Sequence, residues 1–376
     1  MIEYLKILLK KIYKETIIKL FLLIYNKPKL IDKKFKDETA VEYLVNIDGN
    51  RYQIFEFKEG VIFTDSNDTT AYISEKNFLS NASMQYYKID NINSFNGQIS
   101  KNITLKNGTP KLRKKIDGVV LSLLSGGAAK DNFTHWFSDI IPRIKIFSTK
   151  FKLNKIDKFY VPSIKYNYQI ESLKSLGIKQ SQLISSEKSK HLKAKYIYAT
   201  SHPCYHLPMK IKKWSLNFLN KSFSNKNYKD KYKKIFVDRD QLKFINKNNL
   251  KNYKSHRILI NEDEIKKYLH SQGFVIIKPE DYSFKDQIKI FSSANYVVGL
   301  FGAAMMMLAF CKKKTKVIEL KPLLAGNEFK NISKLKKLVH RQINIKPIFS
   351  SSTPQNGLLI CPIKKIDREL NFLNKI

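Results

Sequence analysis

Cysteine is scarce in this chain, and the few cysteines form no framework. Cys204, Cys311 and Cys361 lie far apart, their number is odd, and no CxxC pair occurs. A disulfide scaffold or a structural zinc site is therefore not expected, and a reducing compartment is favoured. A transmembrane span is not expected either, because the apolar run at residues 20–25 is too short to cross a bilayer. No small-residue cleavage site follows that run, which argues against a signal peptide.

Acidic residues are also few. The chain of 376 residues has 69 Lys and Arg against 32 Asp and Glu, a formal net charge of +37. Such a charge suits nucleic acid, an anionic membrane or an anionic substrate as partner. The basic residues are dispersed, however, without zinc-finger spacing or an RNA-binding aromatic signature. Specific nucleic-acid binding is not expected, and a purely compositional origin of the charge, from a bias towards Lys, Asn and Ile, stays open.

The first 26 residues have the pattern of an amphipathic helix. Lys6, Lys10 and Lys14 share one side at helical spacing, while Ile2, Leu5, Leu9 and Ile12 share another. A basic amphipathic helix can lie on an anionic membrane surface, and it can equally pack on the domain that follows. The pattern predicts a helix over 1–26 and leaves both placements open.

The length favours two domains, which we place at 27–214 and 215–376. Short β-rich runs broken by Asn, Asp and Gly occupy residues 42–125. After residue 132 strands and helices alternate with short loops, which predicts parallel, doubly wound sheets. In the second domain, Asn261 and Ser283 are predicted to cap helices, because each directly precedes a helical pattern.

One stretch, NFTHWFSDIIPRI at 132–144, combines unusual polar groups. Its polar residues follow at steps of 3, 4 and 4, namely Asn132, His135, Asp139 and Arg143. On a helix the first three share one face, and Pro142 is expected to end or kink that helix. A carboxylate four residues after a histidine orients the imidazole and raises its basicity, so His135 and Asp139 form a workable acid–base pair. A satisfied buried histidine and a metal pair are the alternatives.

A second candidate site lies in YVVGLFGAAMMML, residues 296–308. An apolar strand runs through Gly299 into a short loop, then Gly302 and a helix. Such a junction presents backbone N–H groups and a helix dipole to a phosphate, and the small Ala303 lets a ligand approach. Glu319 ends the next strand, where a carboxylate can accept hydrogen bonds from a ribose. A plain tight turn and a solvated glutamate are the structural alternatives.

Before these elements, a strand ends in FVDRD, residues 236–240. We favour Arg239 as a cation that clamps a diphosphate, because a guanidinium pairs well with phosphate oxygens. A surface ion-pair cluster is the alternative.

These motifs resemble a known family. NFTHWFSDIIPRI resembles the N-x-x-H-W-x-x-D-x-x-P-R signature of glycosyltransferase family 61, the DUF563-type group. The later motifs are similar in order: a strand ending in Arg239, RILINEDEI at 257–265, FKDQIKIFSSANYVVG at 284–299, GLFGAAMMMLAF and VIEL. The resemblance covers residues 126–322.

The resemblance implies a GT-B-like α/β fold, two Rossmann-like domains facing across a cleft, here with a strand-rich N-terminal part. It implies an inverting glycosyltransferase that moves a sugar from a nucleotide-sugar donor to a glycan or lipid-linked acceptor, with no divalent metal or other cofactor expected. Bacterial members act in capsular or cell-surface polysaccharide biosynthesis. That role suits a cytoplasmic enzyme, peripheral on the inner face of an anionic membrane.

Site roles follow on the matching positions. His135 is expected as the base and Asp139 as its orienting partner, with the reverse assignment open. The other residues expected on the acceptor side are Asn132, Trp136 and Arg143. The residues expected to bind the nucleotide-sugar are Arg239, Gly299, Phe301, Gly302, Ala303 and Glu319.

Two positions depart from the family pattern. Phe301 stands where the loop usually has a histidine, and Asp238 stands where a small residue usually precedes Arg239. These departures keep two alternatives open. One is a non-catalytic binding or scaffold subunit in polysaccharide assembly. The other is a metal-dependent GT-A transferase that holds its cation with Asp238 and Asp240, a DxD pair.

Overall fold

A computed structural model of the chain describes residues 2–30, 37–65, 69–85, 87–89, 92–94, 99–124, 131–204, 210–224, 232–240, 256–350, 353 and 355–376. The chain divides into two compact units, Met1–Leu207 and Pro208–Ile376. Helix α6 (Lys213–Phe223) thus belongs wholly to the second unit, whereas the boundary expected after residue 214 would cut it. The start of the motif-bearing stretch, residues 126–130, lies outside the described residues.

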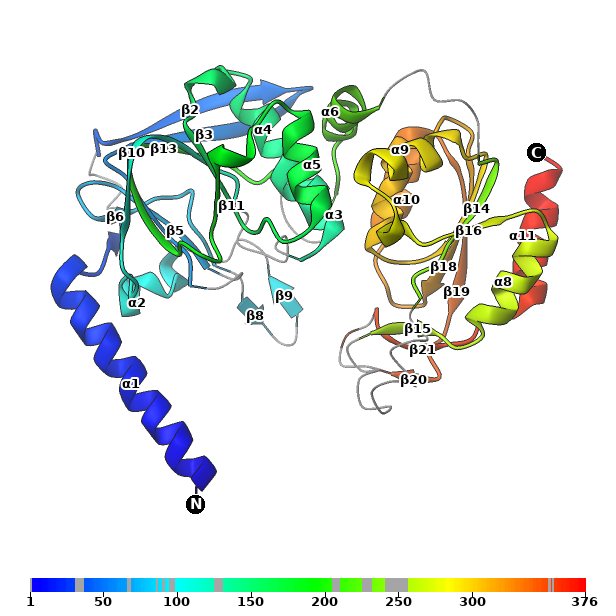
Figure 1. The fold of residues 1–376 in the computed structure, drawn as a ribbon, viewed down its shortest axis with the longest axis horizontal. Helices are drawn as coiled ribbons and strands as arrows, with labels where there is room; N and C mark the ends of the chain where they lie inside the picture. Colours follow the sequence, from blue (N-terminus) through cyan, green and yellow to red (C-terminus); the bar gives the residue numbers. More distant parts are fainter. Residues whose placement is uncertain are drawn as a thin grey trace. The chain divides into compact units, whose positions relative to one another are not determined.

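The first unit is a mixed α/β structure (Figure 1). Its elements are α1 (Ile2–Tyr25), β1 (Lys29–Leu30), β2 (Ala40–Ile47), β3 (Asn50–Lys58), β4 (Val61–Phe63), β5 (Thr69–Ile73), β6 (Phe78–Leu79), β7 (Met84–Gln85), β8 (Tyr87–Ile89), β9 (Ile92–Ser94), η1 (Ile99–Lys101), α2 (Thr104–Asn107), β10 (Lys114–Ser122), α3 (Phe133–His135), η3 (Trp136–Ile140), α4 (Ile141–Phe147), η4 (Leu153–Lys155), β11 (Lys158–Val161), α5 (Asn167–Ser175), η5 (Gln180–Gln182), β12 (Leu183–Ser185) and β13 (His191–Thr200). The strand-rich beginning expected for 42–125 is confirmed.

The main sheet of this unit has the strand order β1-β6-β5-β4-β13-β10-β11-β12, and β3 joins it at β13. Strands β13, β10, β11 and β12 run parallel, whereas β3 and β4 pair antiparallel with β13. Apolar side chains of these strands, among them Phe57, Ile62 and Ile197, form one buried cluster. Of the parallel strands, β11, β12 and β13 follow the helical stretch that carries His135, whereas β10 precedes it, so the α/β region begins one strand earlier than the pattern predicted.

The second unit is a doubly wound α/β structure. After α6 its elements are β14 (Lys234–Val237), β15 (Arg257–Leu259), α8 (Glu262–Ser271), β16 (Val275–Ile277), η7 (Pro279–Asp281), α9 (Phe284–Ser293), β17 (Tyr296–Leu300), η8 (Ala303–Phe310), β18 (Lys316–Pro322), α10 (Glu328–Lys336), β19 (Val339–Ile345), β20 (Phe349–Ser350), β21 (Gly357–Leu359) and α11 (Ile363–Asn374). The described strands β16-β14-β17-β18-β19 form a parallel sheet in that order.

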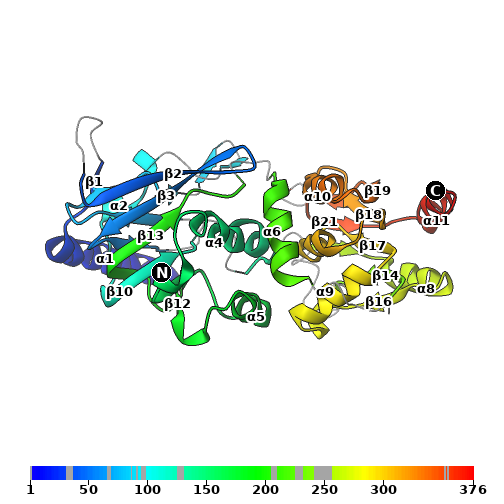
Figure 2. The same cartoon turned by 90° about the horizontal axis from the view of Figure 1, so that it is seen from above.

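Helices cover both faces of this parallel sheet. Helices α8 and α11 lie on one face, and α9 and α10 on the other, as the two views agree (Figures 1 and 2). On the first face, Ile265 of α8 and Ile366 of α11 pack in one cluster with Phe236 and Val298. The strand order reverses direction between β14 and β17, which makes a topological switch point, and ligands of such sheets bind beyond the carboxyl ends of the strands at that point.

The two predicted helix caps have different outcomes. Ser283 caps α9 as predicted, because its side chain accepts a hydrogen bond from the Asp286 N–H at 3.1 Å. The prediction for Asn261 is wrong. Asn261 stands before α8 but makes no capping bond, because its side chain is engaged by Cys361. Its Nδ2 donates to the Cys361 carbonyl at 2.9 Å, and its Oδ1 accepts from the Cys361 N–H at 3.1 Å.

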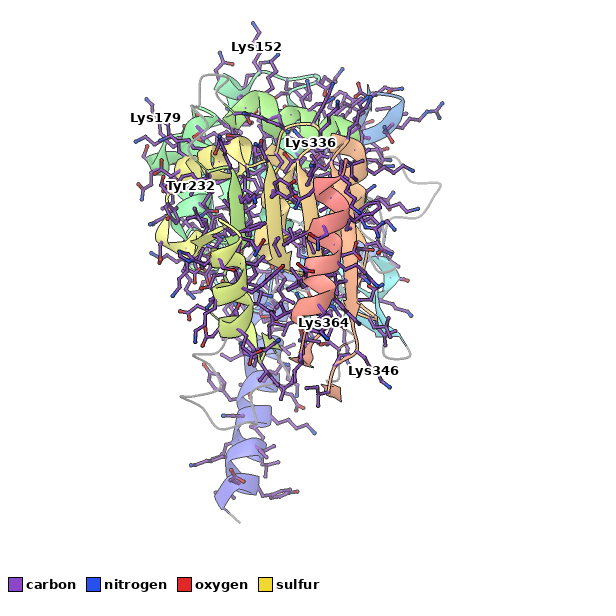
Figure 3. The ribbon with its side chains drawn as sticks, turned by 90° about the vertical axis from the view of Figure 1, so that its right-hand side faces the viewer. Lys152, Lys179, Tyr232, Lys336, Lys346 and Lys364 are labelled. Atoms are coloured by element: carbon purple, nitrogen blue, oxygen red, sulfur yellow. The ribbon has the colours of Figure 1, made fainter. Side chains whose placement is uncertain are left out.

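Helix α1 contacts its unit only towards its C-terminal end. Phe21 is 9% exposed, whereas Leu5, Leu9 and Ile12 are each more than half exposed. None of the described helices is long and apolar enough to cross a membrane. Lysines are spread over many elements, and exposed examples such as Lys346 and Lys364 extend away from the ribbon (Figure 3).

Candidate active site

The polar stretch of the first unit folds as one helix with an inserted turn. Helices α3 and α4 are joined by the π-helical turn η3, in which the Ile141 N–H donates to the Trp136 carbonyl. Pro142 falls in the first turn of α4, where no intrahelical N–H is needed, so the helix continues to Phe147. Pro142 was expected to end or kink the helix; it does not end it, and the irregularity in the helix is the π turn directly before it. Single π turns inside α-helices are frequent at functional sites.

Asp139 is the centre of a polar cluster on this helix. Its Oδ2 lies 2.7 Å from His135 Nδ1, and its Oδ1 accepts a hydrogen bond from Ser138 Oγ at 2.6 Å. Asn132 caps the helix, since its side chain accepts from the His135 N–H at 3.3 Å. Burial works to raise the pKa of Asp139, but attraction to His135 and then to His202 outweighs it and holds the pKa well below its usual range.

His202 is a member of this cluster that sequence reasoning missed. Its Nε2 lies 3.6 Å from Asp139 Oδ2, and its Nδ1 accepts the Cys204 N–H at 3.2 Å. Because Nδ1 accepts, a neutral His202 carries its proton on Nε2, towards the carboxylate. Burial lowers the pKa of His202 despite the attraction of Asp139. The only sequence signal was a histidine in a loop-like stretch after a strand.

The histidine pair differs in accessibility. The side chain of His135 is 18% exposed, against 7% for His202 and 2% for Asp139. An ionised Asp139 only accepts hydrogen bonds, so His135 Nδ1 carries a proton and Nε2 has the lone pair. The arrangement presents a partly exposed imidazole that can take a proton, with a carboxylate at Nδ1 to stabilise the resulting cation.

Trp136 and Arg143 lie inside the unit, both with 0% exposure. Trp136 Nε1 donates to Ser172 Oγ at 3.0 Å, which ties the π turn to α5. Arg143 donates to the Asp139 carbonyl at 3.0 Å and to the Thr200 carbonyl at 2.6 Å. The acceptor contacts expected for these two residues stay a prediction, and their burial favours a role in holding the helix on β13.

In the second unit, two arginines converge beyond the carboxyl ends of β14 and β17. Arg239 Nη1 donates to the Phe301 carbonyl at 3.3 Å, and Arg257 Nη1 donates to the same oxygen. Arg257 also donates to the Gln355 carbonyl and is buried, at 8% exposure. Arg257 begins the RILINEDEI motif, but the sequence does not predict it as a site residue, because nothing in the local pattern brings β15 to this loop.

The two guanidinium groups are close enough to oppose each other's charge. Burial lowers the pKa of Arg257 to about 9, and the positive charge of Arg239 adds to this, while Glu328 and Glu319 oppose it. Burial likewise lowers the pKa of Arg239. A desolvated pair of cations is stabilised by an anion placed between them, and guanidinium forks match the oxygens of a diphosphate.

The Phe301 side chain packs against one arginine of this pair, Arg257. Its ring lies edge-on to Phe329 at 5.1 Å, and the Arg257 guanidinium carbon stands 4.7 Å from the ring centre. The aromatic face attracts the cation. The side chain that stands in place of the family histidine thus supports a cation that comes from β15.

The glycines of the loop allow close packing. A Cβ on Gly302 would lie 2.6 Å from Arg239 Nη1, so the guanidinium occupies the space beside this residue, where η8 begins at Ala303. A Cβ on Gly299 would lie 2.9 Å from Met305 Sδ, so Gly299 lets η8 pack on the sheet. Gly302 and Ala303 therefore border the arginine pair, whereas Gly299 lies beneath it in the core.

Glu319 is fully buried rather than solvated at its strand end. Its Oε2 accepts from Gln342 Nε2 at 2.8 Å and lies 2.9 Å from His340 Nε2. The predicted ribose contact is untested, and the burial makes Glu319 a partner of β19 in this structure.

The DxD carboxylates both have cationic partners. Asp238 Oδ2 lies 3.0 Å from Lys266 Nζ, and Asp240 Oδ2 lies 3.3 Å from Lys278 Nζ. Among the residues that the structure describes, no three His, Cys, Asp or Glu side chains gather as a metal site.

Glu262 links this cluster to Arg239. Its carboxylate is 1% exposed, lies 3.8 Å from Lys266 Nζ, and accepts the backbone N–H of Arg239. Burial, together with the nearby charge of Asp238, raises the pKa of Glu262 from 4.5 to about 7. The folded protein therefore binds this proton more tightly than the unfolded chain, so the stability from Glu262 is present below its unfolded pKa and is lost as pH rises towards 7.

Replacing Glu262 by Gln is expected to remove part of the pH dependence of stability. Between about pH 5 and about pH 8 the free energy of unfolding of the parent should fall by about 1–3 kcal/mol more than that of E262Q, since one pKa unit is worth about 1.4 kcal/mol. Urea unfolding at both pH values measures this. Asp263→Asn, at the exposed neighbouring carboxylate, should behave as the parent. If the stability of the parent and of E262Q depended on pH in the same way, the raised pKa of Glu262 would be rejected.

Two features now stand on one chain: a histidine whose ring is oriented by a carboxylate, and a pair of arginines that converge on one loop. These are the requirements of a transferase that uses a nucleotide-activated donor. Residues 133–318 match the family model described as Glycosyltransferase 61, which confirms the resemblance to glycosyltransferase family 61 over this stretch. That family implies glycosyltransferase activity with a sugar donor and an acceptor. The comparison with curated proteins finds no match.

The matched stretch contains both candidate sites in large part. It includes His135, Asp139, Arg239 and the Phe301 loop, and it ends one residue before Glu319. Asn132 lies one residue ahead of it. The parts of the chain outside the match are mainly the strand-rich beginning, α1 and the last two helices.

Proposed function

We propose that this protein is an inverting glycosyltransferase that moves a sugar from a nucleotide-sugar to a hydroxyl of a glycan or lipid-linked acceptor, in capsular or cell-surface polysaccharide synthesis. The first unit supplies the base and the second unit binds the donor, in the GT-B manner. The observation that carries the proposal is the convergence of Arg239 and Arg257 at the switch point of a doubly wound sheet, where such folds bind nucleotides.

Inversion is a single displacement. The acceptor oxygen attacks the anomeric carbon while the bond from that carbon to the diphosphate oxygen breaks. His135 Nε2 takes the acceptor proton, and Asp139 stabilises the imidazolium through Nδ1. The nucleoside diphosphate leaves with the bonding electron pair, and the two guanidinium groups stabilise the charge that develops on it.

We propose that this reaction proceeds without a bound divalent metal. The arginine pair supplies the positive charge that a cation would otherwise provide, and the DxD carboxylates are engaged by Lys266 and Lys278. Activity that is lost in EDTA and restored by Mn²⁺ would instead support a GT-A type reaction through Asp238 and Asp240.

A panel of nucleotide-sugars and free nucleotides tests the function. Thermal melting should identify the donor, because a ligand that binds only the folded state raises the melting temperature. The product from that donor and an acceptor extract should have the opposite anomeric configuration, as measured by NMR. If a donor binds without any transfer, the protein is a binding or scaffold subunit, and if no donor binds the proposal fails.

We further propose that α1 lies on the inner face of the cell membrane. Its exposed apolar residues form a stripe at steps of 3, 4 or 8, namely Leu5, Leu9, Ile12, Leu20 and Leu23. The packed residues Phe21 and Tyr25 lie on the opposite side of the helix, together with Lys10 and Lys14, whereas Lys6 and Lys19 flank the stripe. An apolar stripe beside lysines is the pattern that binds anionic lipid.

Replacing Leu5 and Leu9 by Gln is expected to weaken binding to anionic vesicles about tenfold or more. Fully burying one leucine side chain in the membrane stabilises the bound state by about 1.5–3 kcal/mol. Co-sedimentation with vesicles measures it. Ile7→Gln changes an exposed apolar residue (66% exposed) off the stripe and should bind nearly as the parent does. If the double variant also binds as the parent, α1 does not mediate the contact.

A further inference from the structure

A cavity of about 220 Å³ lies where the C-terminal end of α1 meets the sheet of the first unit. Its wall comes from α1, the β3–β4 and β5–β6 turns, the loop before β10, and β13. None of its lining residues belongs to the His135 cluster. The lining groups that matter here are Tyr25, Glu59, Glu75, Thr109, Arg113 and Lys193.

Arg113 brings a positive charge into this cavity, where its direct neighbours are a histidine and a tyrosine. Its Nε donates to His191 Nε2 at 3.0 Å, and its guanidinium carbon lies 4.2 Å from the Tyr25 ring centre. His191 Nδ1 lies 2.8 Å from the Lys111 carbonyl, so Nδ1 carries the proton, and burial lowers the pKa of His191 to about 4. No described carboxylate forms an ion pair with the half-buried Arg113, and burial lowers its pKa.

The cavity also contains a hydroxyl without a partner. Thr109 is 2% exposed, and its Oγ1 has no hydrogen-bond partner among the described residues. A buried polar group left unpaired costs about 1–3 kcal/mol, so the site is built to receive an acceptor of hydrogen bonds.

The remaining charges of the cavity leave the Arg113 charge unbalanced. Lys193 Nζ is held 2.9 Å from Glu59 Oε2, which neutralises that pair. Glu75 is exposed at the rim, where water screens its charge. Arg113 is therefore the one lining cation without a counter-ion in the described part of the wall, and an anion would supply that counter-ion.

We propose that this cavity binds a phosphate monoester. The guanidinium fork of Arg113 pairs with two phosphate oxygens, and Thr109 Oγ1 donates to a third. A water molecule takes about 30 Å³, so the volume admits a phosphate together with a glycerol-sized group. Because α1 forms one wall, the ester can arrive as a lipid headgroup from a membrane or as a soluble metabolite.

Calorimetric titration of the full chain with glycerol 3-phosphate tests the shared chemistry. The parent should bind, and Arg113→Gln should bind at least about tenfold more weakly, because a hydrogen bond to a charged group is worth about 1.5–3 kcal/mol. Lys114→Gln removes the same charge from the neighbouring exposed residue and should bind as the parent does.

Thr109→Val keeps the shape of the side chain and removes only the hydroxyl. It should melt at or above the temperature of the parent and still bind glycerol 3-phosphate several-fold more weakly. This variant separates binding from folding if Arg113→Gln proves unstable. Binding by the parent that neither variant changes, or no binding by the parent at all, would overturn the proposal.

Vesicles of phosphatidylcholine with and without phosphatidate distinguish the two sources. If the ester is a lipid headgroup, phosphatidate should increase vesicle binding of the parent and of Lys114→Gln but not of Arg113→Gln. If it is a soluble metabolite, only glycerol 3-phosphate binding should depend on Arg113. If neither glycerol 3-phosphate binding nor vesicle binding depends on Arg113, the proposed site is rejected.

Discussion

His135→Ala is expected to lower kcat by about 10²–10⁴-fold while donor affinity stays close to that of the parent. Losing a general base typically has this cost, and His135 belongs to the first unit, away in sequence from the arginine loop. Added imidazole should restore part of the lost rate, because a free base can then take the acceptor proton. Single-turnover kinetics with the donor found in the nucleotide panel measures both quantities.

The control for this variant is His270→Ala, which removes an exposed histidine from α8. Asp139→Asn tests the orienting role: it keeps the shape but no longer fixes the proton on His135 Nδ1, so kcat should fall and the remaining rate should respond little to imidazole. Turnover of His135→Ala equal to that of the parent would remove His135 as the base. A loss confined to Asp139→Asn would favour the reversed assignment.

Arg257→Gln and Arg239→Gln are each expected to weaken donor binding by about tenfold to a hundredfold and to lower kcat as well. Each guanidinium contributes charge-assisted hydrogen bonds worth about 1.5–3 kcal/mol, and the same charge stabilises the departing diphosphate. Calorimetry with the donor and with the free nucleoside diphosphate measures the binding change. The product should be affected at least as strongly as the donor, since it carries more charge.

Arg341→Gln is the matched control, because it removes an arginine of β19 that is 44% exposed and pairs with Glu369. Since Arg257 also bonds to backbone carbonyls, Arg257→Lys provides a variant that keeps the charge and loses only the fork. Donor affinity in both Gln variants equal to that of Arg341→Gln would show that the pair has a structural role alone.

Local patterns predicted the parts of these sites that a single helix or loop determines. The spacing of His135 and Asp139 predicted their contact, because residues four apart lie on one side of a helix, whereas Asn132 stands before the helix as its cap. Ser283 is correctly predicted as a cap for the same reason, since its bond to Asp286 spans only three residues.

The remainder depends on contacts between distant segments. His202 reaches Asp139 from 63 positions further along the chain, and Arg257 reaches Phe301 across 44. Asn261 follows the local rule for a cap, yet Cys361, 100 residues later, offers its side chain two better-placed partners. The burial of Glu319 could not be predicted from the local sequence either, because it results from contacts with His340 and Gln342 on the next strand. Such pairings depend on sheet register, which no short motif encodes.

The π turn at Trp136–Ile140 bears on how this sequence can change over generations. A π turn contains one residue more than the α-helical path, and removing it would rotate all that follows by about 100°, the angle per residue of a helix with 3.6 residues per turn. Arg143 would then point away from Thr200, and Asp139 would lose either His135 or His202. A point substitution in this segment changes the contacts of one side chain, whereas a one-residue deletion breaks the contacts of Asp139 and Arg143 together. Lineages that keep the activity should therefore differ here in residue type and not in length.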